Sequence, residues 1–127
     1  MKQWLWEALA VGSAGFLGSV ARWMMSSWFN HAFMPWGTLA VNISGSLFLG
    51  WFYTVVEQRI PLSPATKLAV AVGFVGAFTT FSSLMWEADD KFRNQSHWLG
   101  WLYLAGSIIL GLMAVRAGVM LGHATVK

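Results

Sequence analysis

The sequence predicts an all-α integral membrane protein with four transmembrane helices. Hydrophobic residues make up 57% of the 127-residue chain and charged residues only 10%, whereas soluble domains average about 45–50% and about 25%. So few charged side chains cannot cover the surface of a soluble domain, but lipid can cover an apolar one. Four long apolar runs are separated by short segments that hold Pro and charged residues. We assign residues 1–127 to a single four-helix domain.

Each apolar run has about the length that a helix needs to cross a bilayer. About 20 residues span a hydrocarbon core of about 30 Å, and we expect helices at 5–29, 36–57, 66–87 and 97–121. Pro35 precedes the second helix and Pro64 stands where the third begins, as helix-start prolines do. The first run resembles a signal peptide only superficially, because it continues past Ser13 and Gly15 without a clear cleavage site.

The charges that flank the runs carry little information on orientation. If both termini lie on one side, the flanking basic residues of that side are Lys2, Arg59, Lys67 and Lys127. The other side holds Lys91 and Arg93. Lys and Arg favour the cytoplasmic side, and four against two is a weak bias. Insertion in both orientations, which would allow an antiparallel dimer, and a single weakly marked orientation fit the sequence equally well.

The sequence lacks the residues that several classes of function require. The chain has no Cys, so a disulfide framework and a thiolate metal site are excluded. The net charge of +3 includes no basic run, so we expect no nucleic-acid partner. His31, His97 and His123 stand without acids at ligand spacing, and paired carboxylates are missing from the apolar runs. We therefore expect no enzyme.

Polar side chains inside the apolar runs are the candidate functional residues, because such groups usually face protein or water. In the first helix, steps of three and four residues place Gly15, Gly18 and Ser19 on the same face as Arg22. Small residues at this spacing indicate close helix packing. Arg22 can attract an anion or anchor the end of a neighbouring helix.

The second and fourth helices each carry a polar stripe with a four-residue step. In the second, Thr38, Asn42 and Ser46 can join helices by hydrogen bonds. The Asn42 amide has two N–H donors and no charge, so it can also replace part of an anion's hydration. In the fourth helix, Tyr103 and Ser107 supply two hydroxyls on one face, although Tyr103 can equally belong to an aromatic belt.

The third helix is the most informative. Gly73 and Gly76 precede the run Thr-Thr-Phe-Ser-Ser at 79–83. Glycine and β-branched threonine both weaken a helix, and the Thr and Ser hydroxyls compete for backbone carbonyls. We therefore expect a break in the middle of the membrane. Freed carbonyls there would be hard oxygen ligands for an alkali cation, while a continuous helix with back-bonded hydroxyls is the alternative. Glu87 at the predicted helix end is a solvated charge by default and a vestibule group as the alternative.

At these residues the sequence resembles the Fluc (CrcB) fluoride-channel family over nearly the whole chain. The matching motifs are Gly15-x-x-Gly18-x-x-x-Arg22-Trp23, Trp36-Gly37-Thr38-Leu39-x-Val41-Asn42-x-x-Gly45, Gly73-Phe74-x-Gly76-x-x-Thr79-Thr80-Phe81-Ser82 and Tyr103-x-x-x-Ser107. The pair Gly-Thr-Leu…Asn and Gly…Thr-Thr-Phe-Ser, in this order in a four-span chain, is highly specific.

The resemblance implies a dual-topology antiparallel homodimer in the cell (inner or plasma) membrane that conducts fluoride passively through two pores. It implies a structural Na⁺ at the dimer interface, held by the main-chain carbonyls of Gly76 and Thr79 from both subunits. The implied pore residues are Asn42, the ring of Phe81, the hydroxyls of Ser82, Ser83, Thr38, Tyr103 and Ser107, a vestibule group Arg22 and a pore-end group Glu87.

The chain departs from the family pattern at three positions. Leu84 stands where many members have a second Phe, Met85 where a serine is common, and Gly111 where some members carry serine. Because of these differences, the set of aromatic rings and the line of polar side chains that the family pattern places along the pore are each incomplete in this sequence. The alternative function is a small dual-topology proton-coupled exporter, which needs an acid at bilayer depth. Glu7, the only acid in the first span, lies too near the terminus for that role.

Overall fold

The computed structural model describes residues 2–126, and four helical spans in that range are long and apolar enough to cross a membrane. The first is α1 (Gln3–Phe29), the second is α2 (Trp36–Gln58) and the fourth is α6 (His97–Thr125). The third span, Pro64–Asn94, consists of consecutive segments. They are α3 (Pro64–Leu68), the π-helical η1 (Ala69–Val75), α4 (Gly76–Phe78) and α5 (Phe81–Asn94). The four predicted spans are therefore present; Lys127, counted above for orientation, lies outside the described residues.

The predicted break is present in the middle of the third span. Thr79 and Thr80 have extended backbone angles, with φ/ψ of −80°/158° and −150°/121°. A new helix, α5, begins at Phe81 directly after them. The alternative of a continuous helix is therefore wrong. The π-helical turns of η1 just before the break were not predicted, because apolar periodicity does not distinguish them from an α-helix.

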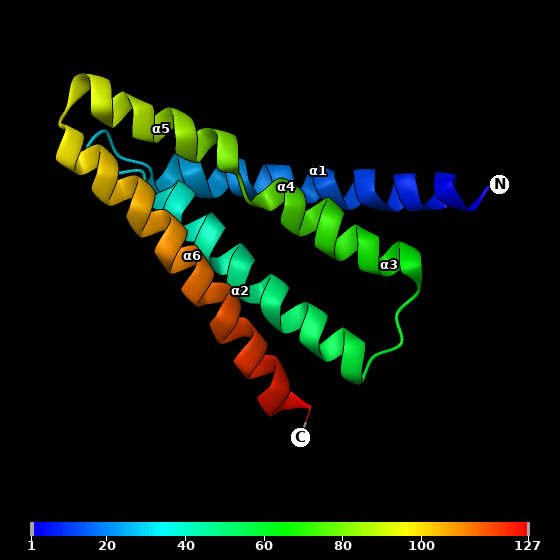
Figure 1. The fold of residues 1–127 in the computed structure, drawn as a ribbon. Coiled ribbons are helices and arrows are strands. Elements are labelled where there is room, and N and C mark those ends of the chain that lie inside the picture. The colour runs from blue at the N-terminus through cyan, green and yellow to red at the C-terminus, as the bar shows by residue number, and fades with distance from the viewer. Residues whose placement is uncertain (1, 127) are drawn as a thin grey trace.

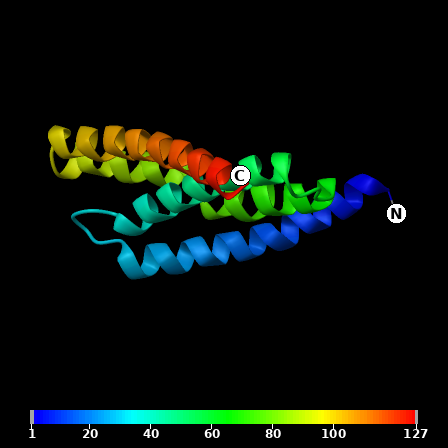
Figure 2. The same cartoon turned by 90° about the horizontal axis from the view of Figure 1, so that it is seen from below.

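The third span changes its packing partner at this break. Its first half, α3 to α4, lies along α1, whereas α5 lies along α6 (Figure 1). The α2 helix packs most extensively on α6 and lies between α6 and the first half of the third span (Figure 1). In Figure 2, α1 forms one side of the molecule and α6 lies on the opposite side. The break thus lets one span contact both halves of the bundle.

The predicted end of the third helix near residue 87 is wrong, because α5 continues to Asn94. Polar residues there form i,i+4 pairs on an exposed helix face, a pattern that stabilises helix. Arg93 pairs with Asp89 at 2.6 Å, and the Asn94 side chain donates to Asp90 at 2.7 Å. The polarity of this segment indicated a connector, but the segment belongs to a helix that these side-chain pairs stabilise.

Glycines bring helix backbones into direct contact on both sides of the molecule. A Cβ added at Gly18 would lie 2.3 Å from the Phe74 carbonyl oxygen, and one at Gly118 would lie 2.0 Å from the Leu47 carbonyl oxygen. Neither position tolerates a larger side chain without separation of the helices. The small-residue packing predicted for the first helix is therefore confirmed at Gly18, where α1 meets η1.

The outer surface is apolar, and the interior of the single chain is small. Phe16, Trp98 and Met120 are 69%, 75% and 72% exposed. The buried apolar residues gather in small clusters, one around Leu84 and Tyr103 and another around Phe52 and Val56. A surface of this kind suits lipid, because hydrocarbon covers apolar side chains that water would not.

Hydrogen bonds join the segments between and after the helices at the two ends of the bundle. At one end, the Gln95 side chain before α6 donates to the Ala32 carbonyl in the connector between α1 and α2, at 3.0 Å. We call this the connector end. At the other end, Arg59 after α2 donates to the carbonyl of Val126 after α6. An even number of spans therefore brings both chain ends to the same side.

Candidate functional site

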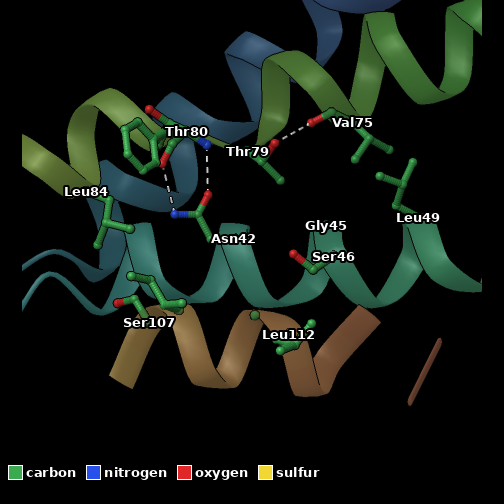
Figure 3. Close-up of a pocket in the computed structure, with 13 residues that line it drawn as sticks. Asn42, Gly45, Ser46, Leu49, Val75, Thr79, Thr80, Leu84, Ser107 and Leu112 are labelled. Atoms are coloured by element: carbon green, nitrogen blue, oxygen red, sulfur yellow. Dashed lines mark hydrogen bonds between the residues drawn. The ribbon is translucent and has the colours of Figure 1, made fainter. Parts of the chain in front are cut away.

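The break in the third span is held by an amide side chain from α2. The Asn42 Nδ2 donates to the Thr80 carbonyl at 3.0 Å, and the Thr80 amide donates to the Asn42 Oδ1 at 2.7 Å (Figure 3). An amide group matches the donor and acceptor of an extended residue, and so it satisfies the backbone that the break has freed. Asn42 keeps one N–H that these two bonds do not use.

Arg22 approaches the same break from α1. Its Nη1 lies 3.4 Å from the Thr79 carbonyl oxygen, a long contact for a hydrogen bond. The contact fits an anchor at the end of a neighbouring helix, one of the two roles predicted for Arg22. The close approach of α1 at Gly18 brings the guanidinium to this depth.

The hydroxyls after the break belong to the start of α5. The Thr80 Oγ1 accepts from the Ser83 amide at 3.2 Å, the geometry of an N-cap. The same hydroxyl donates to the Ser83 Oγ at 3.1 Å and lies 3.4 Å from the Ser82 Oγ. The predicted residues Ser82 and Ser83 therefore gather with Thr80, whose role as cap was not predicted.

A pocket of about 290 Å³ opens beside the break, between α2, the third span and α6 (Figure 3). The polar groups on its wall are Asn42, Ser46, Thr79, Thr80 and Ser107. Phe81 and Leu84 also line it, but Phe81 is 71% exposed whereas Leu84 is 6% exposed. The two positions are thus not equivalent, and Phe81 presents its ring at the open side.

A second polar group, which we call the outer group, surrounds Glu87 nearer the connector end. The Thr38 hydroxyl donates to Glu87 Oε1 at 2.7 Å, and the Tyr103 hydroxyl donates to Oε2 at 2.6 Å. The Asn30 Nδ2 also donates to Oε1, at 3.2 Å. The default prediction of a solvated charge at a helix end is therefore wrong: Glu87 lies within α5 and three side chains from other elements bind it.

Tyr103 and Ser107 link the two groups along α6. Tyr103 is 3% exposed inside the bundle, so the structure contradicts its alternative placement in an aromatic belt. The Ser107 hydroxyl donates to the Tyr103 carbonyl at 2.6 Å and stands on the wall of the pocket at the break. The α2 stripe runs parallel to it, with Thr38 at Glu87 and Asn42 at Thr80.

We name this arrangement the polar track: a line of polar side chains from the break to the connector end. Of the predicted pore residues, the structure brings Asn42, Ser82, Ser83 and Phe81 to the break and Thr38, Tyr103 and Glu87 to the outer group. Sequence reasoning missed Asn30, Thr80 and Lys91. Thr80 was detectable as a Thr at the start of a helix; Asn30 and Lys91 gave no signal in a polar connector.

The carbonyls at the break suit an alkali cation in their chemistry. The Thr80 amide donates to Asn42, so it is not available to the Gly76 carbonyl four residues earlier, as it would be in a continuous helix. Residues 2–126 hold no cluster of three or more His, Cys, Asp or Glu that could bind a metal ion. A cation site in this part of the chain would therefore use neutral oxygens such as those of Gly76 and Thr79, which are hard ligands.

Comparisons with known proteins agree with this architecture. The family described as "CrcB-like protein, Camphor Resistance (CrcB)" matches residues 9–119. A "Fluoride-specific ion channel FluC" of a Synechococcus strain is 37% identical over 119 residues, which cover 91% of this chain and 90% of that protein. The protein of the same name from Chlorobium luteolum is 40% identical over 116 residues, covering 90% of each chain.

A third relative, "Fluoride-specific ion channel FluC 1" of Symbiobacterium thermophilum, is 41% identical over 117 residues, covering 88% of this chain and 94% of that protein. The family match at residues 9–119 extends into all four spans and includes the positions of both polar groups of the track. The chain is therefore a multi-pass membrane protein that belongs to the CrcB family.

Proposed function

We propose that this chain is the subunit of a fluoride channel that exports fluoride passively and so gives resistance to the ion. One observation carries the proposal: a track of hydroxyl and amide groups runs from the break to the connector end inside a bundle that is otherwise apolar. Relatives that share most of the chain are named fluoride-specific ion channels. The proton-coupled exporter is not favoured by these relatives.

The chemistry of the track suits a small anion that holds its water strongly. Such an ion needs many hydrogen-bond donors in direct contact with it, and these donors should be neutral so that they do not trap it. At the break, the unused N–H of Asn42 and the hydroxyls of Ser82 and Ser83 are neutral donors. The edge of the Phe81 ring carries partial positive charge and can face an anion. Arg22 completes the vestibule as a cation anchored at the break.

At the outer group the ion must share its donors with a carboxylate. The hydroxyl protons of Thr38 and Tyr103 are directed to Glu87, and that of Ser107 is directed to a backbone carbonyl. A fluoride ion at this level would compete with these acceptors for hydrogen bonds from the same hydroxyl groups. Glu87 is thus the pore-end group, and its negative charge is the main electrostatic obstacle on the path.

We further propose that two copies assemble in opposite orientations, as a dual-topology homodimer in the plasma membrane. Phe81 is 71% exposed beside a pocket that is open on one side of the single chain. Polar groups facing lipid are costly, and a second copy would cover them. Na⁺ at the interface would be held by the Gly76 and Thr79 carbonyls and would offset the repulsion between carbonyl dipoles of the two broken spans.

Fluoride efflux from liposomes tests this function. Purified protein is reconstituted in vesicles loaded with fluoride, and a K⁺ gradient with valinomycin sets the voltage while a fluoride electrode records release. We expect electrically driven efflux that does not depend on a proton gradient. Efflux that requires a proton gradient would identify the exporter, and the absence of efflux from well-reconstituted protein would contradict both.

A further inference from the structure

Lys91 is a cation buried at the connector end of the polar track. The side chain lies on α5, one turn after Glu87, and is 2% exposed. Its Nζ donates to the Phe33 carbonyl at 2.7 Å and lies 5.6 Å from the centre of the Tyr103 ring. Glu87 binds the hydroxyl of the same tyrosine at 2.6 Å. A positive and a negative group thus bracket the phenol at the outer end of the track.

The two charges also share a pocket of about 230 Å³, which lies between the α1–α2 connector and α5. The other groups on its wall are Asn30, His31, Ala32, Pro35, Trp86 and Asp90. Asp90 accepts from Asn94 at 2.7 Å and adds a second carboxylate to the wall. Among the described residues that line this pocket, Lys91 is therefore the one Lys or Arg, and it shares the wall with two acids.

An anion that enters this pocket meets the field of both carboxylates, which line its wall. Like charges repel at these short distances, more strongly in partly buried surroundings than in water. We propose that Lys91 offsets the negative charge of Glu87 and Asp90, and thereby keeps the connector end of the track open to the anion. The inference rests on the proposed fluoride channel and assigns Lys91 as a positioning residue for its permeation path.

Lys91 has a structural role from which this electrostatic role must be separated. Its bond to Phe33 holds the connector that carries Asn30 onto α5. Lys91→Gln keeps an N–H donor for that carbonyl and removes the charge, whereas Lys91→Arg keeps both. The double variant Lys91→Gln/Asp90→Asn removes one charge of each sign from the pocket wall and leaves Glu87 unchanged. A purely structural Lys91 would not be rescued by the second change.

Efflux rates in liposomes, with assembly checked by gel filtration, test the inference. We expect Lys91→Gln to slow efflux about tenfold, the lower end of the range by which charged clefts change association rates. Lys91→Arg should match the parent chain, and the double variant should regain most of the loss. Arg93→Gln is the matched control: it removes an exposed cation two residues away that pairs with Asp89, and its rate should not change.

If Lys91→Gln does not fold, Asp90→Asn tests the same charge balance in the opposite direction and should speed efflux at low fluoride. The inference would be overturned by parent-like efflux from a folded Lys91→Gln protein, or by a double variant no faster than the single one. Neither result would contradict the proposed channel function. An Asp90→Asn rate equal to that of the parent would overturn it too. An unmodified chain without any efflux would overturn the proposed function, and the inference with it.

Discussion

Asn42 is the residue through which the second helix and the broken third span depend on each other. Both atoms of its amide group bond to the backbone of Thr80. A side chain that only joined helices could be replaced by another polar group of similar size. A side chain that also donates its remaining N–H to an anion must stay neutral, because a charge would either trap the ion or repel it.

Asn42→Asp distinguishes these two roles. The carboxylate can still accept from the Thr80 amide, but it cannot donate to the Thr80 carbonyl or to an anion. At an effective dielectric of about 20, a like charge about 4 Å away opposes the ion by about 4 kcal/mol. We expect efflux to fall by more than about 100-fold, since about 1.4 kcal/mol is a factor of ten.

Ser44→Ala on the same helix is the matched control. The Ser44 hydroxyl bonds to carbonyls of its own helix, at 2.7 Å to Ala40, and it is exposed away from the track. Its efflux rate should not change. An Asn42→Asp protein that assembles normally and releases fluoride at the parent rate would remove Asn42 from the permeation path.

At the scale of elements, the broken third span determines which groups are available for chemistry. Its two extended residues redirect the chain from α1 to α6 and turn main-chain groups toward α2. Helix α5 then begins with a proper cap, so the break does not leave the new N-terminus unsatisfied. The break is thus a stable part of the fold, with partners for its backbone on both sides.

Thr80→Val isolates the cap from the backbone contacts of the same residue. Valine suits the extended conformation and keeps the bonds to Asn42, but it loses the hydroxyl that accepts from the Ser83 amide. We expect a loss of about 1 kcal/mol in the free energy of unfolding, together with slower efflux because the hydroxyl group at the break is disturbed. Thermal unfolding in detergent and liposome efflux measure the two effects.

Ser96→Ala is the comparison for this prediction. Ser96 caps α6 by accepting from the Leu99 amide at 3.1 Å, at an exposed turn outside the pocket at the break. A similar loss of stability should occur without an effect on efflux. If Thr80→Val slowed efflux no more than Ser96→Ala, the hydroxyl of Thr80 would have no part in permeation.

Gly76→Leu tests the proposed cation site on the same span. The nearest atom to an added Cβ at Gly76 is the Ala71 carbonyl oxygen at 3.7 Å, so the single chain has room there. If the Gly76 carbonyl lies at the dimer interface, leucine should block assembly while the helix content measured by circular dichroism stays unchanged. Gel filtration should then detect monomers.

Gly106→Leu on α6 provides the control, because an added Cβ there meets no atom within 4 Å. This variant should remain a dimer. A Gly76→Leu chain that still forms dimers with parent-like efflux would show that the Gly76 carbonyl lies away from the interface.

Sequence alone predicted the spans and the break because each depends on local composition. Apolar runs of the right length define spans, and the glycines and hydroxyls near Thr79 weaken a helix wherever they occur. The environment of Glu87 could not be predicted in this way, because its donors come from three other elements that only the fold brings together. Lys91 looked like a solvated residue of a connector for the same reason.

At the scale of the whole molecule, a single chain leaves polar groups at bilayer depth on an open side. The pocket at the break is open on one side, and the ring of Phe81 on its wall is exposed. The orientation signal is weak, because four basic residues flank the spans at the end that holds the termini and two flank them at the connector end. A chain with so little bias can supply both members of an antiparallel pair.

Fixing the orientation tests this assembly directly. Asn94→Lys/Gln95→Lys adds positive charge at the connector end, and Ile60→Lys/Ala124→Lys adds it at the end that holds the termini; all four side chains are exposed. Positive charge retains a loop in the cytoplasm, so the two variants should insert in opposite orientations. An antiparallel dimer needs a second copy in the opposite orientation, which neither variant can supply when it is expressed alone. We expect each variant alone to give little fluoride efflux from cells and their co-expression to restore it, with labelled termini on one side for each variant and on both sides for the parent. Parent-like efflux from either variant expressed alone in a single verified orientation would exclude the antiparallel dimer.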